Sequence, residues 1–102
     1  MTSQNTGAEI VLEAYNLITG DRQNSYSHPF DDYDRTVNIF NAVMGHDVLS
    51  VEEGVIYMVC VKLSRLMHEI RTNQWNPDNI RDAIGYLGCL QMVREHRNVI
   101  SK

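Results

Sequence analysis

The stretch from residue 50 to about residue 70 constrains the fold more than any other part of the sequence. It opens with the capping box SVEE at residues 50–53, in which Ser50 and Glu53 satisfy the first free N–H groups of a helix. Between Val55 and Val61 this helix is apolar on almost every side, and such a helix is normally buried all round. Three neighbouring helices in so short a chain scarcely enclose it. We therefore expect subunits to pack against one another as a homo-oligomer.

Three further segments have the spacing of amphipathic helices. A capping box at residues 6–9 begins the first, which ends at Gly20. The second runs from about Asp32 to Val43, with Gly45 as its stop. Its apolar stripe consists of Tyr33, Val37, Phe40 and Met44. We expect Asp31 or Asp32 to cap this helix.

The last helix is predicted to begin with Asn76 as its cap and Pro77 at its first position, and to reach about Asn98. Only a short turn around residues 71–76 separates it from the helix before, so these two long helices should pack antiparallel. No β-type alternation is present in the sequence. The prediction is an all-α, compact four-helix bundle that forms a single domain over residues 1–102.

Composition excludes several classes of partner. The chain has 102 residues, 43% of them hydrophobic, and a net charge of -4, which is typical of a small globular domain without a surface for duplex nucleic acid. The longest strongly apolar run, Val55 to Val61, is far shorter than a membrane span, so no membrane partner is expected. Residues 1–7 lack the features of a signal peptide. These observations predict a cytoplasmic protein, in the host cytoplasm if a phage encodes it.

Cys60 and Cys89 each precede a histidine on the same predicted helix, which raises the question of zinc. The partners stand seven or eight residues apart, about 10–12 Å along a helix, which is too far for one ion. Two buried thiols are the better interpretation.

Charged residues interrupt the predicted core. Lys62 and Arg65 share one helix face, and Asp78 and Asp82 share another. One interpretation is a pair of interhelical salt bridges, because unpaired buried charges are costly. The antiparallel register pairs Arg65 with Asp82.

The same register leaves Lys62 beside Gly85 and Tyr86, without a carboxylate of its own. A spare ammonium group next to a small residue suits an external phosphate. An alternative assigns Glu69, Asp78 and Asp82 to a Mg²⁺ ion, which would activate water in a hydrolase. No cofactor is expected otherwise.

The connection GDRQNSYSHPFDDYDR at residues 20–35 is longer than a helix–helix loop needs to be. Arg22 offers a fork of donors suited to phosphate, and Asp21 can accept backbone N–H groups. Tyr26 can anchor the loop, and the proline after His28 restricts the direction of that histidine. We expect these four residues to contact a ligand, together with Lys62, Arg65, Asp82 and Tyr86 of the bundle.

Together these residues form a pattern that resembles a small all-helical family of phages and prophages, catalogued as a domain of unknown function. Its members read G-D-R-x-x-x-Y-G-H-P, then K-x-x-R, then D-N-x-x-D-x-x-G-Y. Here the three pieces begin at Gly20, Lys62 and Asp78, and the resemblance covers about residues 9–97. Ser27 stands in place of a glycine of the pattern, and Phe40 in place of a common tryptophan.

More remotely, the chain resembles phage nucleotide-modification-associated domains and MazG-like nucleotide pyrophosphatases. The resemblance implies a phage accessory protein that binds a nucleotide or cyclic nucleotide and sequesters a signal of host antiviral defence. A Mg²⁺-dependent nucleotide pyrophosphohydrolase is the first alternative. A structural or protein-interaction bundle held by internal salt bridges is the second.

Overall fold

The computed structural model describes residues 7–20 and 28–101, the side chains of residues 99–101 excepted. Helices account for nearly all of this part of the chain, and no strand occurs in it. The helices are α1 (Gly7–Thr19), α3 (Pro29–Met44), α4 (Val51–Arg71) and α5 (Asp78–Ser101). The predicted all-α fold is confirmed, with each boundary within a few residues of its expected place.

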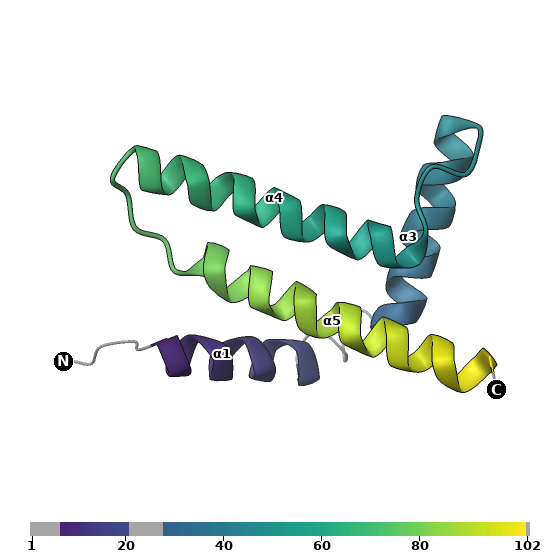
Figure 1. The fold of residues 1–102 in the computed structure, drawn as a ribbon, viewed down its shortest axis with the longest axis horizontal. Coiled ribbons are helices and arrows are strands. Elements are labelled where there is room, and N and C mark those ends of the chain that lie inside the picture. The colour runs from purple at the N-terminus through teal and green to yellow at the C-terminus, as the bar shows by residue number, and fades with distance from the viewer. Residues whose placement is uncertain (1–6, 21–27, 102) are drawn as a thin grey trace.

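Helices α4 and α5 form a long antiparallel hairpin, which is the centre of the fold (Figure 1). Helix α1 lies along α5. Helix α3 stands steeply across the end of the hairpin away from its turn, where it contacts both α4 and α5 (Figure 1). Among the described elements α1 packs on α5 alone. Helix α4 is therefore covered by α5 along its length and by α3 only near its start.

The predicted capping box of α4 is present. The Ser50 hydroxyl oxygen accepts a hydrogen bond from the Glu53 N–H at 3.1 Å, and the Glu53 carboxylate accepts one from the Ser50 N–H at 2.9 Å. The hydrogen bond from the Ser50 backbone N–H to the Glu53 carboxylate, and next the Ser50 side chain beside that carboxylate, hold the pKa of the Glu53 carboxyl below its ordinary value. At the start of α5, Asn76 Oδ1 accepts from the Asp78 N–H at 3.1 Å, as expected of a cap.

The predicted cap of α3 is wrong. Neither Asp31 nor Asp32 caps this helix; His28 does, with its Nδ1 accepting from the Phe30 N–H at 3.0 Å. Pro29 occupies the first turn, where its missing N–H costs nothing, so the helix begins before the aspartates. Both carboxylates lie in the first turn instead, where they favour the positive end of the helix dipole.

The core lies in the half of the hairpin next to α3. Its buried members are Tyr33, Val51, Val55, Cys89 and Val93. On the other side of α5, the side chain of Ile18 in α1 packs onto two glycines. A Cβ atom at Gly85 would lie 3.4 Å from Ile18, and one at Gly88 only 2.8 Å. The glycines of α5 thus let α1 approach closely.

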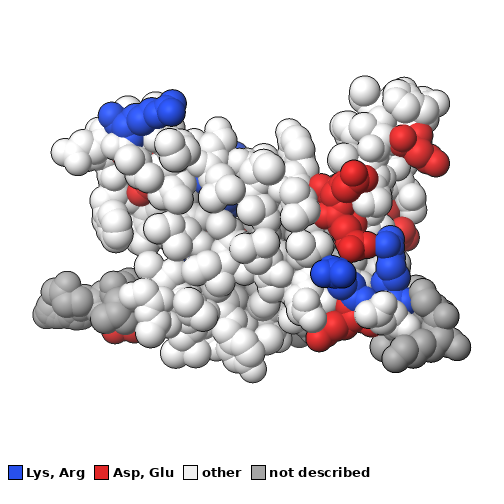
Figure 2. Space-filling view, in the orientation of Figure 1, with Lys and Arg blue, Asp and Glu red and all other residues white. Residues whose placement is uncertain are grey.

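A single chain does not bury α4 on every side, as expected when three neighbouring helices scarcely enclose it, and the expected packing of subunits stays a prediction. Ile56, Leu63, Met67 and Ile70 are all more than two-fifths exposed, and Cys60 is exposed as well. The reason is the path of the chain, because α1 covers α5 and leaves the outer face of α4 open. The face of the hairpin in Figure 2 carries few charged side chains away from its two ends.

Phe40 and Met44 on the α3 stripe are also substantially exposed, while Tyr33 and Val37 are buried as expected. The second half of α3 extends past the hairpin (Figure 1), where the returning segment 45–50 lies along it and the Asn41 side chain accepts from the Val48 and Leu49 N–H groups. This short segment leaves Phe40 and Met44 largely uncovered. None of the described helices is both long enough and apolar enough to cross a membrane.

Candidate functional site

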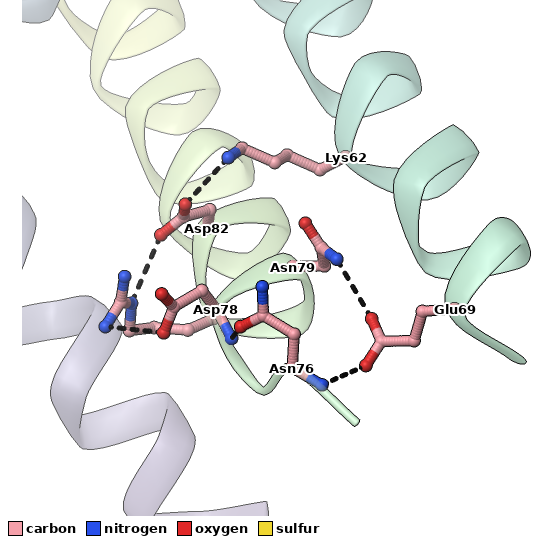
Figure 3. A network of polar contacts seen from close by, with 7 residues as sticks. Lys62, Glu69, Asn76, Asp78, Asn79 and Asp82 are labelled. Atoms are coloured by element: carbon pink, nitrogen blue, oxygen red, sulfur yellow. Dashed lines mark hydrogen bonds and ion pairs between the residues drawn. The ribbon is translucent and has the colours of Figure 1, made fainter. Parts of the chain in front are cut away.

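A polar cleft of about 630 Å³ opens between α4 and α5 near the turn that joins them. Five of the residues singled out from the sequence line it, namely Lys62, Arg65, Glu69, Asp78 and Asp82. The remaining lining residues are Ser64, His68, Gln74, Asn76 and Asn79. The antiparallel hairpin therefore brings the K-x-x-R piece of α4 to the D-N-x-x-D piece of α5 (Figure 3).

The prediction that Arg65 pairs with Asp82 is wrong. Lys62, not Arg65, forms the ion pair, with Nζ at 2.8 Å from Asp82 Oδ2 (Figure 3). The other carboxylate oxygen of Asp82 accepts from Arg81 Nε at 3.1 Å. The hairpin register is close to the predicted one, but a shift within one helical turn exchanges the two cations. Lys62 is thus a structural cation and has no spare charge.

Both members of this pair are largely withdrawn from water, with side chains 14% exposed for Lys62 and 24% for Asp82. Burial raises the pKa of the Asp82 carboxyl, but the hydrogen bonds and positive charges of Lys62 and Arg81 outweigh it. The net result is a pKa below the ordinary value of an aspartate. Asp82 is therefore held firmly in its ionised form.

Arg65 is the cation that remains available. Arg65 lines the cleft and is exposed to solvent. Within the described parts of the chain it makes no hydrogen bond or ion pair. Its guanidinium group can present several N–H donors to one anion. His68, one helical turn further along α4, lines the same cleft and is also exposed.

Glu69 organises the end of the cleft nearest the turn. Its buried carboxylate accepts from the backbone N–H of Asn76 and, at 2.9 Å, from Nδ2 of the buried Asn79 (Figure 3). The carboxylate thus ties the incoming turn and the first turn of α5 to α4. Asn79 was predicted only as a member of the family pattern, although an amide beside a helix cap is a natural hydrogen-bond donor.

The three proposed Mg²⁺ ligands do not form a metal site. Across residues 7–20 and 28–101, no three His, Cys, Asp or Glu side chains lie close enough together to hold an ion. Glu69 binds amides, whereas Asp78 pairs with Arg81 at 3.2 Å and Asp82 with Lys62 and Arg81. Arg81, for which the spacing of charges predicted no role, pairs with both aspartates.

Gly85 and Tyr86 do not belong to the cleft. Gly85 faces Ile18 of α1, as described above, so the space beside it accommodates a helix and not a ligand. Tyr86 packs against the core, with its ring edge-on to Tyr33 at 6.4 Å between centroids. The expected ligand contact from Tyr86 is therefore replaced by a packing role.

The loop residues are not brought to the cleft by any described contact. Asp21, Arg22 and Tyr26 lie outside the described residues. His28 caps α3, and its ring lies 4.9 Å from the ring of His96, which also packs on Phe30 at 4.6 Å. Fourteen residues of α5 separate His96 from Asp82, about 21 Å at the rise of a helix. His28 thus lies at the opposite end of the hairpin from the cleft.

The fold and the cleft define a small all-helical domain with a polar recess between its two longest helices. The chain belongs to the family described as "Domain of unknown function (DUF6378)", whose profile matches residues 9–94. It is also 24% identical over 86 residues to the "Gene 55 protein" of Mycobacterium phage D29.

That alignment covers 84% of this chain but 54% of the relative, so the chain spans about half the length of the phage protein it matches. No solved structure matches the chain. The expected small phage-type helical domain is thus supported. The more remote likeness to MazG-like enzymes stays a prediction.

Proposed function

We propose that the domain binds a small phosphate-bearing ligand of the nucleotide class in the α4–α5 cleft. The observation that carries this proposal is Arg65, an exposed guanidinium group over a cleft, without an acidic partner in the described structure. A volume of about 630 Å³ suits a ligand of this size. Arg65 and His68 would contact the phosphate, since arginine recognises phosphate through paired N–H donors.

The opposite wall suits the rest of such a ligand. Asn76, Asn79 and Gln74 offer amide groups, and the carboxylate of Asp78 is half exposed. Amides and carboxylates pair with the ring nitrogens, amino groups and hydroxyls of a nucleoside. The negative charges on this wall are balanced in part by Lys62 and Arg81, which lowers their repulsion of an anion.

Binding without hydrolysis is favoured by the engagement of the carboxylates. Each carboxylate proposed for Mg²⁺ already accepts hydrogen bonds or pairs with a cation of the chain, so an ion would have to displace them. A protein that holds a nucleotide intact suits the sequestration of a nucleotide signal of host antiviral defence. The mycobacteriophage relative makes a phage accessory role the natural setting for this activity.

The test is to incubate the protein with nucleoside mono- and triphosphates, cyclic dinucleotides and inorganic phosphate, with and without Mg²⁺. The mixture is then dialysed, heated to release bound material and analysed by chromatography. Intact nucleotide recovered after heating supports sequestration, whereas a Mg²⁺-dependent monophosphate product supports the pyrophosphohydrolase instead. Absence of both across the panel would leave the structural alternative.

A matched pair of variants localises the binding. Arg65→Ala should weaken nucleotide affinity about tenfold or more, in line with the loss of a charge-assisted hydrogen bond. Arg35→Ala removes an arginine from the exposed surface of α3 and serves as the control, with affinity unchanged. Equal affinities for the two variants would remove the cleft from consideration.

A further inference from the structure

The exposed face of α4 contains a regular apolar stripe. Ile56, Cys60, Leu63, Met67 and Ile70 follow one another at intervals of four, three, four and three residues. That alternation is the spacing of the seam of a coiled coil, in which one helix packs against another along its length. The four large hydrophobic side chains of the stripe are between 43% and 60% exposed. The stripe runs for about 21 Å along the helix axis.

The stripe is separate from the face that α4 presents to α5. The buried positions of α4 are Val51, Val55, Val59 and Glu69. At 100° per residue, Val59 lies about 60° from the centre of the stripe, at its edge, and the other three lie about 100–140° from it. Helix α4 therefore has two contact faces, of which the described chain fills one. Arg65 lies on the opposite side of the helix from the stripe, so a partner on the stripe would leave the cleft open.

We propose that the stripe is the interface of a homodimer, in which α4 packs antiparallel against α4 of a second copy about a two-fold axis at Leu63. In this arrangement Leu63 meets its own counterpart, Cys60 faces Met67, and Ile56 faces Ile70. The same patch serves both subunits, as a two-fold interface requires.

Charged residues beside the stripe favour a second copy of the chain as the partner and an antiparallel direction for it. Glu53 and Arg71 are both exposed and lie along one edge of the stripe, at its two ends. In the antiparallel pair Arg71 comes within two residues of the level of the other copy's Glu53 at each end, about 3 Å along the axis. A parallel pair would leave Glu53 and Arg71 at opposite ends of the interface, so this ion pair could not form. Antiparallel packing also opposes the two helix dipoles favourably.

The first test is the mass in solution, measured by analytical ultracentrifugation over a range of protein concentrations. The expected result is a dimer of the 11.7 kDa chain. Leu63→Glu brings two carboxylates together at the axis and should weaken association at least a hundredfold, giving a monomer with an unchanged helical circular dichroism spectrum. Val43→Glu, at an exposed apolar position on α3, is the control and should remain dimeric.

Disulfide trapping tests the direction. The wild-type chain should form no Cys60 disulfide across the dimer, since antiparallel packing sets the two Cys60 residues about 9 Å apart along the axis. Met67→Cys should form disulfide-linked dimers under mild oxidation, by reaction with Cys60 of the other copy. Ready oxidation of the wild type through Cys60 would indicate parallel packing and overturn the proposed arrangement.

Salt adds a finer measurement. Arg71→Glu should weaken the dimer about two- to fivefold at low ionic strength, and less at 1 M salt. A wild-type monomer at all concentrations, or a dimer that survives Leu63→Glu, would refute the interface. The proposal does not depend on nucleotide binding: Leu63→Glu should retain the nucleotide affinity of the wild type, so each idea can fail alone.

Discussion

The two halves of the α4–α5 hairpin are built in opposite ways. The half beside α3 is dry, with Val55, Cys89 and Val93 almost fully buried and the Glu52 ion pairs to Arg94 and Arg97 confined to its surface. In the half near the turn, the helices face each other through Lys62, Asp82, Glu69 and amides, around an open cleft. The same antiparallel contact thus supplies stability at one end and recognition at the other.

Apolar burial and polar burial make different demands on sequence. A dry contact tolerates exchange among side chains of similar volume. A polar contact fails when one partner is missing, because the group left behind is buried without a hydrogen bond. The turn half should therefore be the less tolerant of isosteric change, although the dry half contributes more free energy per residue.

The largest expected effect is in the dry half. Val55 is 0% exposed, so Val55→Ala removes two methyl groups and leaves a cavity. We expect the free energy of unfolding to fall by about 2–3 kcal/mol. Val43→Ala, at a side chain 78% exposed, is the matched control and should change it by less than about 0.5 kcal/mol. Urea denaturation at a single low protein concentration measures both, and equal losses would contradict the assignment of the core.

The next effect is in the turn half. Glu69→Ala leaves the Asn76 N–H and the Asn79 amide without their acceptor, and we expect a loss of about 2 kcal/mol. Glu69→Gln keeps one acceptor oxygen at nearly the same volume, so its loss should be smaller. A loss for Glu69→Gln equal to that for Glu69→Ala would contradict this and mean that both carboxylate oxygens are required as acceptors, because the amide nitrogen of glutamine can only donate. Glu95→Ala on the exposed surface of α5 is the control.

Sequence patterns predicted the parts of this fold that depend on local chemistry. The capping box at Ser50, the Asn76 cap and the antiparallel hairpin all follow from short-range rules, and all are present. The hairpin also brings Lys62 and Asp82 to one place, because a short turn leaves little freedom in register.

The sequence did not predict how α4 and α5 are rotated about their axes within that register. It also did not predict the path of the chain outside the hairpin. A shift of less than one turn decides whether Lys62 or Arg65 meets Asp82, and spacing alone does not resolve it. In the sequence, Gly85 is equally consistent with space for a ligand and with close packing of a neighbouring helix. The position of α1 in the structure shows that a helix occupies this space. His28 was expected to contact a ligand because Pro29 restricts its direction near Arg22 and Tyr26. The cap of α3 was assigned to the aspartates beside it, since histidine is an uncommon capping residue.

Lys62 takes the role predicted for Arg65, so substitutions of the two residues can be compared within one helix. Lys62→Met removes a mostly buried partner of Asp82, which keeps Arg81, so we expect a loss of about 1 kcal/mol. Arg65→Met should change stability by less than about 0.5 kcal/mol, because its side chain has no partner in the described structure. Thermal and urea unfolding check both. A larger loss for Arg65→Met would restore the register in which Arg65 pairs with Asp82.

The smallest effect is the pH dependence that Asp82 contributes to stability. Burial raises the pKa of its carboxyl, but Lys62 and Arg81 lower it further, so the folded-state pKa lies below that of the unfolded chain. The stabilisation is therefore complete above the ordinary carboxyl pKa near pH 4 and is lost as the pH falls through the lower folded-state value. Asp82→Asn removes this titration but keeps the lowered pKa of Glu53.

The difference in unfolding free energy between the wild type and Asp82→Asn should thus be constant from pH 7 to about pH 5 and shrink by up to about 1 kcal/mol in more acidic solution. Urea denaturation at a series of pH values measures it, with the Glu53 contribution cancelling between the two proteins. A difference that does not change with pH would mean that Asp82 acts by packing and hydrogen bonding alone. In that case the ion pair with Lys62 would position the two side chains in the cleft without adding charge-dependent stability.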